Sequence, residues 1–189
     1  INLVIKAGET IVFKGYTDDE KNTVIDLILR MQQPSSGALL LDDHPLNDIV
    51  LDCLHSSIGI VSKNGRLLSG SIAENIAYGK LRCSQTLVGE GRVQLTPVEC
   101  HYIAVARNSL KNPSIVILDE LPALDAPDAG HFLSALDKLT HQRTTLIFNR
   151  HIPPLKKIDR IVVLENGCIT KNLTHMRSSN HGSTQGNTD

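Results

Sequence analysis

The sequence has no run of about 18 uncharged apolar residues, the length that a membrane-spanning helix needs. An action at a membrane would therefore need another chain or another segment. The chain also lacks an excess of positive charge, since its formal net charge is −1, and no basic face indicates a nucleic-acid partner. With 189 residues, 41% of them apolar, it is long enough for one domain with a hydrophobic core.

Neither cysteine nor histidine shows the spacing of metal ligands. The four cysteines are scattered without a C-x-x-C pair, which favours free thiols in a reducing compartment over disulfides or a zinc site. The eight histidines contain no H-x-x-x-H pair. The chain begins at Ile1 rather than at a methionine, so we expect it to be part of a longer protein.

Short apolar runs alternate along the chain with segments of helical apolar spacing. The runs predict strands over residues 10–13, 38–41, 58–61, 115–118, 144–148 and 160–164. The spacing predicts helices over residues 23–31, 72–78, 97–110 and 127–139. This order predicts an α/β fold whose mainly parallel sheet is covered by helices on both faces. We expect an antiparallel element from the start of the chain and a disordered polar tail over residues 171–189.

Two of the predicted strand ends carry polar residues suited to ligand binding. One is the segment from Gly15 to Thr23, and the other is the pair Asp119-Glu120. Ligands of parallel α/β sheets bind beyond the carboxyl ends of the strands. The sequence therefore predicts a functional site at these two strand ends.

Several segments, in a fixed order, resemble a known family. They are Gly8-Glu9-Thr10, Pro34-Ser35-Ser36-Gly37, Ser69 to Gly79, Ile103 to Arg107, Lys111-Asn112-Pro113, Ile117 to Glu120, Ala123-Leu124-Asp125 and Asp159 to Gly167. Together they make residues 1–169 similar to the nucleotide-binding domain of ABC exporters. The runs Ser69 to Gly79 and Ile117 to Asp125 are the most specific to that family.

The resemblance implies a P-loop NTPase-like three-layer fold over residues 1–170, with ATP and Mg²⁺ as cofactors. It implies two partners, which are a second nucleotide-binding domain in a homo- or heterodimer and the transmembrane domain of an exporter. The place of action would be the cytoplasmic face of a membrane, reached through a partner or a missing transmembrane segment. The stretch between Lys63 and Leu95 is shorter than in the family, so we expect a reduced helical subdomain.

The phosphate-binding loop of the family, G-x-x-G-x-G-K-S-T, corresponds to the segment from Gly15 to Thr23. Lys21, which would reach the phosphates, is present. Asp18 and Glu20 replace the inner glycines, whose freedom of conformation lets backbone N–H groups wrap a phosphate. Asn22 replaces the hydroxyl that would bind Mg²⁺, and Thr23 is offset by one position.

Three further family positions are altered. Lys63 stands where a glutamine would contact Mg²⁺, and a charged lysine has no lone pair for a cation. Leu95 to Glu99 replaces the signature segment, and its Pro97 lacks a backbone N–H. Arg150 stands at the switch-histidine position, and His151 follows it, which turns that side chain to the other face of a strand end.

The acidic motif is intact. Asp119 matches the Mg²⁺-binding aspartate, Glu120 matches the catalytic base, and Asp125 matches an aspartate that crosses the dimer interface. Asp119 and Glu120 form either a site for Mg²⁺ and water or a relic that caps a strand end.

Other residues also allow two interpretations. Lys21 is either a phosphate ligand or a solvated loop lysine neutralised by the carboxylates at 18–20. Arg150 contacts phosphate or lies on the surface, and His151 is a switch or a polar loop residue. Leu95 to Glu99 is a signature or a plain helix start with Thr96 as its cap.

Phosphoryl transfer depends on positioning and charge stabilisation, so several altered contacts together predict little or no hydrolysis by this chain alone. We expect a degenerate ATP-binding domain of an ABC exporter. If it hydrolyses ATP, Glu120 would position water and Asp119 would hold Mg²⁺. The alternative is a pseudo-ATPase that serves as an interaction or scaffold module. The exporter-like run from Ser69 to Gly79 argues against a working ATPase of another P-loop family.

Overall fold

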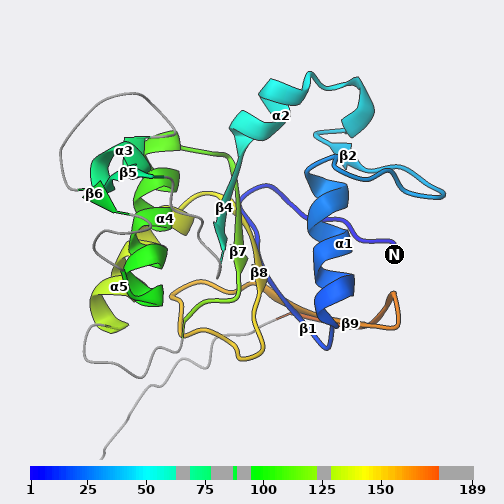
Figure 1. Cartoon of the computed structure of the whole chain (residues 1–189). Coiled ribbons are helices and arrows are strands. Elements are labelled where there is room, and N and C mark those ends of the chain that lie inside the picture. The colour runs from blue at the N-terminus through cyan, green and yellow to red at the C-terminus, as the bar shows by residue number, and fades with distance from the viewer. Residues whose placement is uncertain (63–68, 78–86, 89–94, 123–128, 175–189) are drawn as a thin grey trace, which may run out of the picture.

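The computed structural model describes residues 1–62, 69–77, 87–88, 95–122 and 129–174 (Figure 1). A six-stranded sheet in the order β10-β9-β1-β8-β7-β4 forms its centre. Neighbouring strands are parallel except for β10, which pairs antiparallel with β9 at one edge. The strands are β1 (Thr10–Lys14), β4 (Ile58–Ser62), β7 (Ile115–Asp119), β8 (Thr144–Phe148), β9 (Arg160–Glu165) and β10 (Cys168–Thr174).

Helices cover both faces of the sheet. Figure 1 shows α1 (Asp18–Ile28) on one side, with α4 (Pro97–Lys111) and α5 (Ala129–Thr140) on the other. Smaller elements complete the described fold: β2 (Leu40–Leu41), β3 (His44–Pro45), the 3₁₀ turn η1 (Leu46–Asp48), α2 (Leu51–Ser57), β5 (Gly70–Ser71), α3 (Ile72–Ala77) and β6 (Leu87–Val88). The predicted α/β fold with a mainly parallel sheet is confirmed.

The core consists of two layers, one on each side of the sheet. Successive strand residues point to opposite faces. Ile11 and Phe13 of β1 therefore join the layer under α1 and α2, whereas Val12 between them joins the layer under α4 and α5. Phe148 of β8 is fully buried and stacks on Phe13 with ring centroids 4.7 Å apart. Both faces of the central strands are thus buried, which explains their uninterrupted apolar sequence.

Local signals at helix ends are also confirmed. Thr96 caps α4, with Pro97 in the first turn and Asn112 in the left-handed conformation at the end. Ser71 caps α3, because its hydroxyl accepts the N–H of Glu74 at 3.0 Å. Asn166 and Gly167 both have positive φ between β9 and β10, as a two-residue hairpin turn requires.

Four expectations about element positions are wrong. The antiparallel strand comes from Cys168–Thr174 rather than from the start of the chain, where residues 1–6 have no strand. The tail expected from Lys171 is part of that strand up to Thr174, and residues 175–189 lie outside the described part. The run at 38–41 forms only the two-residue strand β2. Helix α1 begins at Asp18 and not at Thr23, because a polar capping arrangement rather than apolar spacing starts it.

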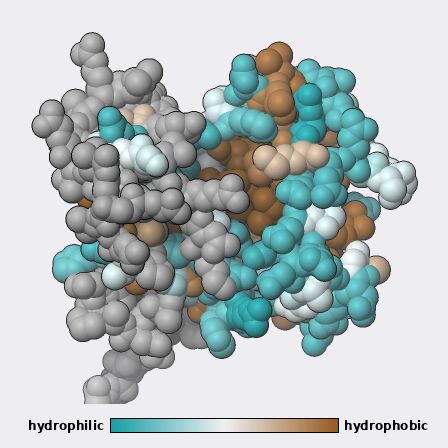
Figure 2. All heavy atoms as spheres, in the orientation of Figure 1, coloured by the Kyte–Doolittle hydropathy of each residue, from teal (hydrophilic) through white to brown (hydrophobic). Residues whose placement is uncertain are grey.

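Apolar and polar surface are unevenly distributed over the α1 side of the molecule. Figure 2 shows mainly hydrophilic residues towards the lower end of α1 and an apolar area at the α2 end. The exposed apolar side chains there include Met31, Val50 and Leu51. The acidic first turn of α1 lies at the opposite end of that helix. In the described residues, no helix is both long enough and apolar enough to cross a membrane.

Candidate functional site

An ion cluster joins the first turns of α1 to the end of β7. The Lys21 ammonium lies 2.8 Å from Asp119 Oδ1 and donates a 3.0 Å hydrogen bond to Glu120 Oε1. The contact with Asp119 is an ion pair. Asp18 lies farther away, 3.9 Å from the same ammonium. The structure therefore brings together three of the residues that the sequence singled out.

Lys21 is buried although it belongs to a polar segment, with only 7% of its surface exposed. Burial lowers its pKa, but the close contacts with Asp119 and Glu120 and their charges outweigh burial, so the pKa is raised. The ammonium therefore stays charged at neutral pH. The interpretation of Lys21 as a solvated loop lysine is wrong, because the side chain is buried and its nearest carboxylates are those of β7 and the residue after it.

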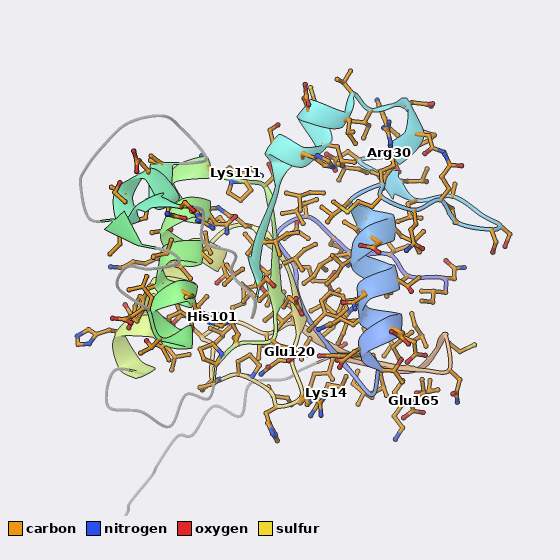
Figure 3. The ribbon with its side chains drawn as sticks, viewed as in Figure 1. Lys14, Arg30, His101, Lys111, Glu120 and Glu165 are labelled. Carbon is orange, nitrogen blue, oxygen red and sulfur yellow. The ribbon has the colours of Figure 1, made fainter. Side chains whose placement is uncertain are left out.

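The position of Glu120 depends on an unusual backbone. Its φ is +52°, a left-handed value that is uncommon for a residue with a side chain. Its N–H donates to Phe148 O at 2.8 Å, and its carbonyl lies 3.3 Å from Nε2 of the buried His101. Figure 3 shows Glu120 at the end of the sheet, between α1 and the helix that carries His101. The backbone on both sides of this residue is thus held by neighbouring elements.

The first turn of α1 is closed by its own side chains. Thr17 Oγ1 accepts the N–H of Glu20, and the Glu20 carboxylate accepts the N–H of Thr17 at 2.7 Å, which makes a capping box. The same carboxylate accepts the N–H of Gly167 at 2.6 Å. These hydrogen bonds lower the pKa of Glu20. A carboxylate therefore occupies a backbone donor at the helix start, where the resemblance places a phosphate.

Gly15 lies between β1 and this helix start and has a φ of +79°. A side chain there would meet β9, since an added Cβ would lie 2.9 Å from Val163 Cγ1 and 3.0 Å from Leu164 O. Gly15 is therefore needed for the path of the chain, whether or not a phosphate binds nearby.

The remaining candidate residues that the structure describes lie outside the cluster. Asn22 and Thr23 are exposed on α1, and the Thr23 hydroxyl donates to Asp19 O at 2.7 Å. Arg150 has a 75% exposed side chain that reaches Asp18 at 4.0 Å, and His151 is exposed. These positions agree with the surface interpretation of Arg150 and the loop interpretation of His151.

Some predicted features lie outside the described residues. These are Lys63, Asp125 and most of the stretch between Lys63 and Leu95. The segment at 95–99 is described, and it is the start of α4: Thr96 Oγ1 accepts the N–H of Glu99, and Glu99 accepts the N–H of Thr96 at 2.7 Å. The expected helix start with Thr96 as its cap is therefore present in this segment.

Sequence reasoning missed three residues around the cluster. Ser62, at the end of β4, donates to Asp119 Oδ2 at 3.2 Å. Tyr16 packs edge-on against Phe148, and burial raises its pKa to about 12, with Lys21 opposing this effect. His101 approaches Glu120 from α4. Nothing local in the sequence reveals these contacts, but the Thr-x-x-Glu pattern at 17–20 was a readable sign of the helix start.

The fold is the three-layer α/β type of P-loop NTPases, and comparison with known proteins gives the family. The family described as "ABC transporter" matches residues 1–123, so this chain belongs to the ABC transporter family. An ABC transporter ATP-binding protein of Bacillus subtilis is 35% identical over 200 residues, and an ATP-dependent lipid A-core flippase of Alcanivorax borkumensis is 33% identical over 203.

These alignments cover 93% and 94% of this chain but 35% of each relative. A protein of Staphylococcus aureus, named as a multidrug export ATP-binding/permease protein, is 34% identical with the same coverage as the Bacillus protein. The chain thus spans about a third of the length of the curated relatives it matches. The alignment with the Bacillus protein spans more positions than the 189 residues of this chain, so the relative carries residues without a counterpart here.

ABC ATPase domains bind ATP with Mg²⁺. In the observed arrangement, the described residues that would hold Mg²⁺ and phosphate contact one another instead. The Glu20 carboxylate accepts the Thr17 N–H at the start of α1, and Asp18 and Asp19 add negative charge beside it. Asp119 and Glu120 both contact the Lys21 ammonium, a cation that occupies the oxygens a metal would use.

Proposed function

We propose that this chain is a degenerate nucleotide-binding domain of an ABC exporter, which binds ATP weakly and does not hydrolyse it alone. The observation that carries this proposal is the closed start of α1. In the Thr17–Glu20 capping box, the Glu20 carboxylate accepts the Thr17 N–H and the Thr17 hydroxyl accepts the Glu20 N–H, so two backbone donors that would wrap a phosphate are already taken.

Charge supports the same conclusion. Two phosphate oxygens entering this turn would meet the carboxylates of Asp18, Asp19 and Glu20. Like charges about 4 Å apart repel each other, and the repulsion is stronger near a protein surface than in bulk water. Three such carboxylates therefore weaken triphosphate binding strongly, although the exposed position and dissolved salt reduce the effect.

Catalysis should suffer more than binding. Phosphoryl transfer relies on donors and cations that are already in place, and one lost donor costs about 100-fold or more in rate. Here Glu120 contacts Lys21, while Arg150 and His151 are exposed. Glu120 would position water, Asp119 would hold Mg²⁺ and Lys21 would bind phosphate only after their mutual ion pairs break.

The partners follow from the family and from the relatives' names. We propose that the domain acts beside a second nucleotide-binding domain and the transmembrane domain of an exporter, on the cytoplasmic face of a membrane. The relatives include proteins named as a flippase and as an export ATP-binding/permease protein, which supports an exporter. In such an assembly this would be the nucleotide-binding domain that does not hydrolyse ATP.

The second candidate is a scaffold module with no nucleotide role. The closed helix start favours it as well, because a scaffold has no ligand to admit. The two functions differ in one property, which is whether any saturable ATP binding remains.

The test is a titration with a fluorescent ATP analogue and Mg²⁺, from micromolar to millimolar, followed by anisotropy and by phosphate release. Saturable binding that plain ATP displaces, without turnover, is the expected result. No binding up to millimolar ATP would favour the scaffold, and steady turnover by this chain would overturn both candidates.

A pair of double variants sharpens the test. Asp18→Gly with Glu20→Gly removes two carboxylates at the site and should increase ATP affinity. Asp42→Gly with Asp43→Gly is the matched control, since it removes the same charge at two positive-φ positions between β2 and β3. Equal affinity gains in both variants would mean that net charge, and not the closed helix start, limits binding.

A further inference from the structure

The cation nearest to the acidic pair is part of the chain itself. Lys21 reaches Asp119 and Glu120 from α1, at 2.8 and 3.0 Å, and all three side chains are largely buried, with 8%, 17% and 12% of their surfaces exposed. Two buried carboxylates this close together repel each other, and a cation between them offsets the repulsion. The ammonium supplies that cation without any ligand.

An ammonium and a divalent metal cannot share this place. Mg²⁺ needs oxygen ligands at about 2.0–2.1 Å, and it repels a positive charge. Lysine has three donors and no acceptor while charged, so it can only compete with the metal for the oxygens. Among the described residues, no group of three or more metal-ligating side chains exists.

We infer that the Lys21 ammonium replaces the divalent cation at Asp119 and Glu120, so this acidic pair is closed to metal in the resting chain. The inference rests on the proposed function and deepens it, because Mg²⁺ that arrives with ATP would have to displace Lys21 from the two carboxylates. The inference concerns metal binding and not nucleotide binding, so it can be tested separately from the proposed function.

Removing the ammonium should open a metal site. The oxygens left behind would be the two carboxylates and the Ser62 hydroxyl, which already bonds to Asp119. The Tyr16 hydroxyl is also buried and has no hydrogen-bond partner in the described part of the chain. Such an oxygen set suits Mg²⁺ or Mn²⁺.

The experiment titrates Mn²⁺ without nucleotide and follows water-proton relaxation. It compares the wild-type chain with Lys21→Ala and with Lys14→Ala, a control that removes the same charge at the end of β1. The wild type and Lys14→Ala should bind no Mn²⁺ saturably up to the millimolar range. Lys21→Ala should bind one ion per chain at least about tenfold more tightly, a free-energy change of about 1.4 kcal/mol. Adding Asp119→Asn to Lys21→Ala should abolish this gain in Mn²⁺ affinity.

Thermal stability gives an independent readout, because an ion that binds only the folded state raises Tm. Mn²⁺ should raise the Tm of Lys21→Ala and leave that of the wild type unchanged. Wild-type binding of one Mn²⁺ that is lost in Asp119→Asn overturns the inference, as does a folded Lys21→Ala that gains no affinity. If Lys21→Ala does not fold, the Mn²⁺ titrations of the wild type and of Asp119→Asn still test the inference.

Failure here and failure of the proposed function are distinguishable. A wild type that binds Mn²⁺ but shows no ATP turnover removes only the inference about Lys21. A wild type that binds no Mn²⁺ but hydrolyses ATP overturns the proposed function. It does not contradict the inference that Lys21 keeps metal from Asp119 and Glu120.

Discussion

The Glu20 carboxylate accepts a 2.6 Å hydrogen bond from the backbone N–H of Gly167, 147 residues later in the chain. This bond joins the start of α1 to the β9–β10 turn. Hydrogen bonds to an ionised carboxylate are stronger than neutral ones. We therefore expect the Gly167 amide to be protected from hydrogen exchange although it lies in a surface turn.

Glu20→Ala should accelerate exchange at Gly167, as measured by nuclear magnetic resonance. Asp19→Ala is the matched control, since Asp19 is also acidic and lies in the same helical turn. Unchanged exchange at Gly167 in Glu20→Ala would contradict the prediction.

Gly59 of β4 leaves room for α4. A Cβ added there would lie 2.7 Å from Pro113 Cγ and would also clash with Asn108 Oδ1. Asn108 cannot move freely, because its Nδ2 donates to Ile60 O and Ala104 O, both at 2.8 Å. Overpacking of this kind costs typically about 1–3 kcal/mol, so Gly59→Ala should lower the free energy of unfolding by that amount.

Urea unfolding checks this value. Gly130→Ala serves as the control, since Gly130 lies on the exposed side of α5 with no atom near an added Cβ. That substitution should stabilise the protein by roughly 0.5–1 kcal/mol through helix propensity. A Gly59→Ala variant as stable as the wild type would mean that β4 and α4 separate easily.

Lys111 has a structural role at the end of α4. Its ammonium donates to His55 O and Ile58 O, both at 2.6 Å, and burial lowers its pKa. Lys111→Met keeps the aliphatic stem but leaves both carbonyls without this donor. The expected loss is about 1–3 kcal/mol of unfolding free energy.

Thermal or urea unfolding of Lys111→Met measures that loss. Lys138→Met on the exposed face of α5 removes the same charge and should change stability by no more than about 0.5 kcal/mol. Equal effects of the two variants would show that net charge, rather than the two carbonyl contacts, accounts for the change.

The start of α4 should weaken in acid. Hydrogen bonds from the backbone and side chain of Thr96 lower the pKa of Glu99 below its ordinary value of 4.5. A lowered folded-state pKa means that the stabilisation is complete above pH 4.5 and is lost as the pH falls through the folded-state value. Glu99→Gln should therefore destabilise the protein at pH 7 and have less effect at lower pH.

The measurement is the difference in urea midpoint between wild type and Glu99→Gln from pH 7 down to the acid limit of folding. Thr96→Ala, which removes the other half of the capping box, should cost about 1 kcal/mol at pH 7. A difference for Glu99→Gln that stays constant with pH would mean that its charge does not stabilise the helix start.

Local sequence patterns predicted much of this fold. The apolar run at 115–118 and the Pro97 helix start depend on neighbours within a few residues, so they could be recognised without a structure. The missed start of α1 was local as well, since Thr17 and Glu20 show the capping pattern. Edge strand β10 was missed because its exposed polar sequence, including Lys171, resembles a tail.

The resemblance to the family, the alternation of strands and helices, and the carboxylates in place of the loop glycines follow from the order of the amino acids. The contacts of Lys21 depend on the folded chain. Asp119 and Glu120 lie almost 100 positions from Lys21 in the sequence. They meet it because β1, β8 and β7 are parallel neighbours whose carboxyl ends lie at the same end of the sheet. Burial at this end of the sheet makes an unpaired charge costly, so the lysine and the two carboxylates pair with one another.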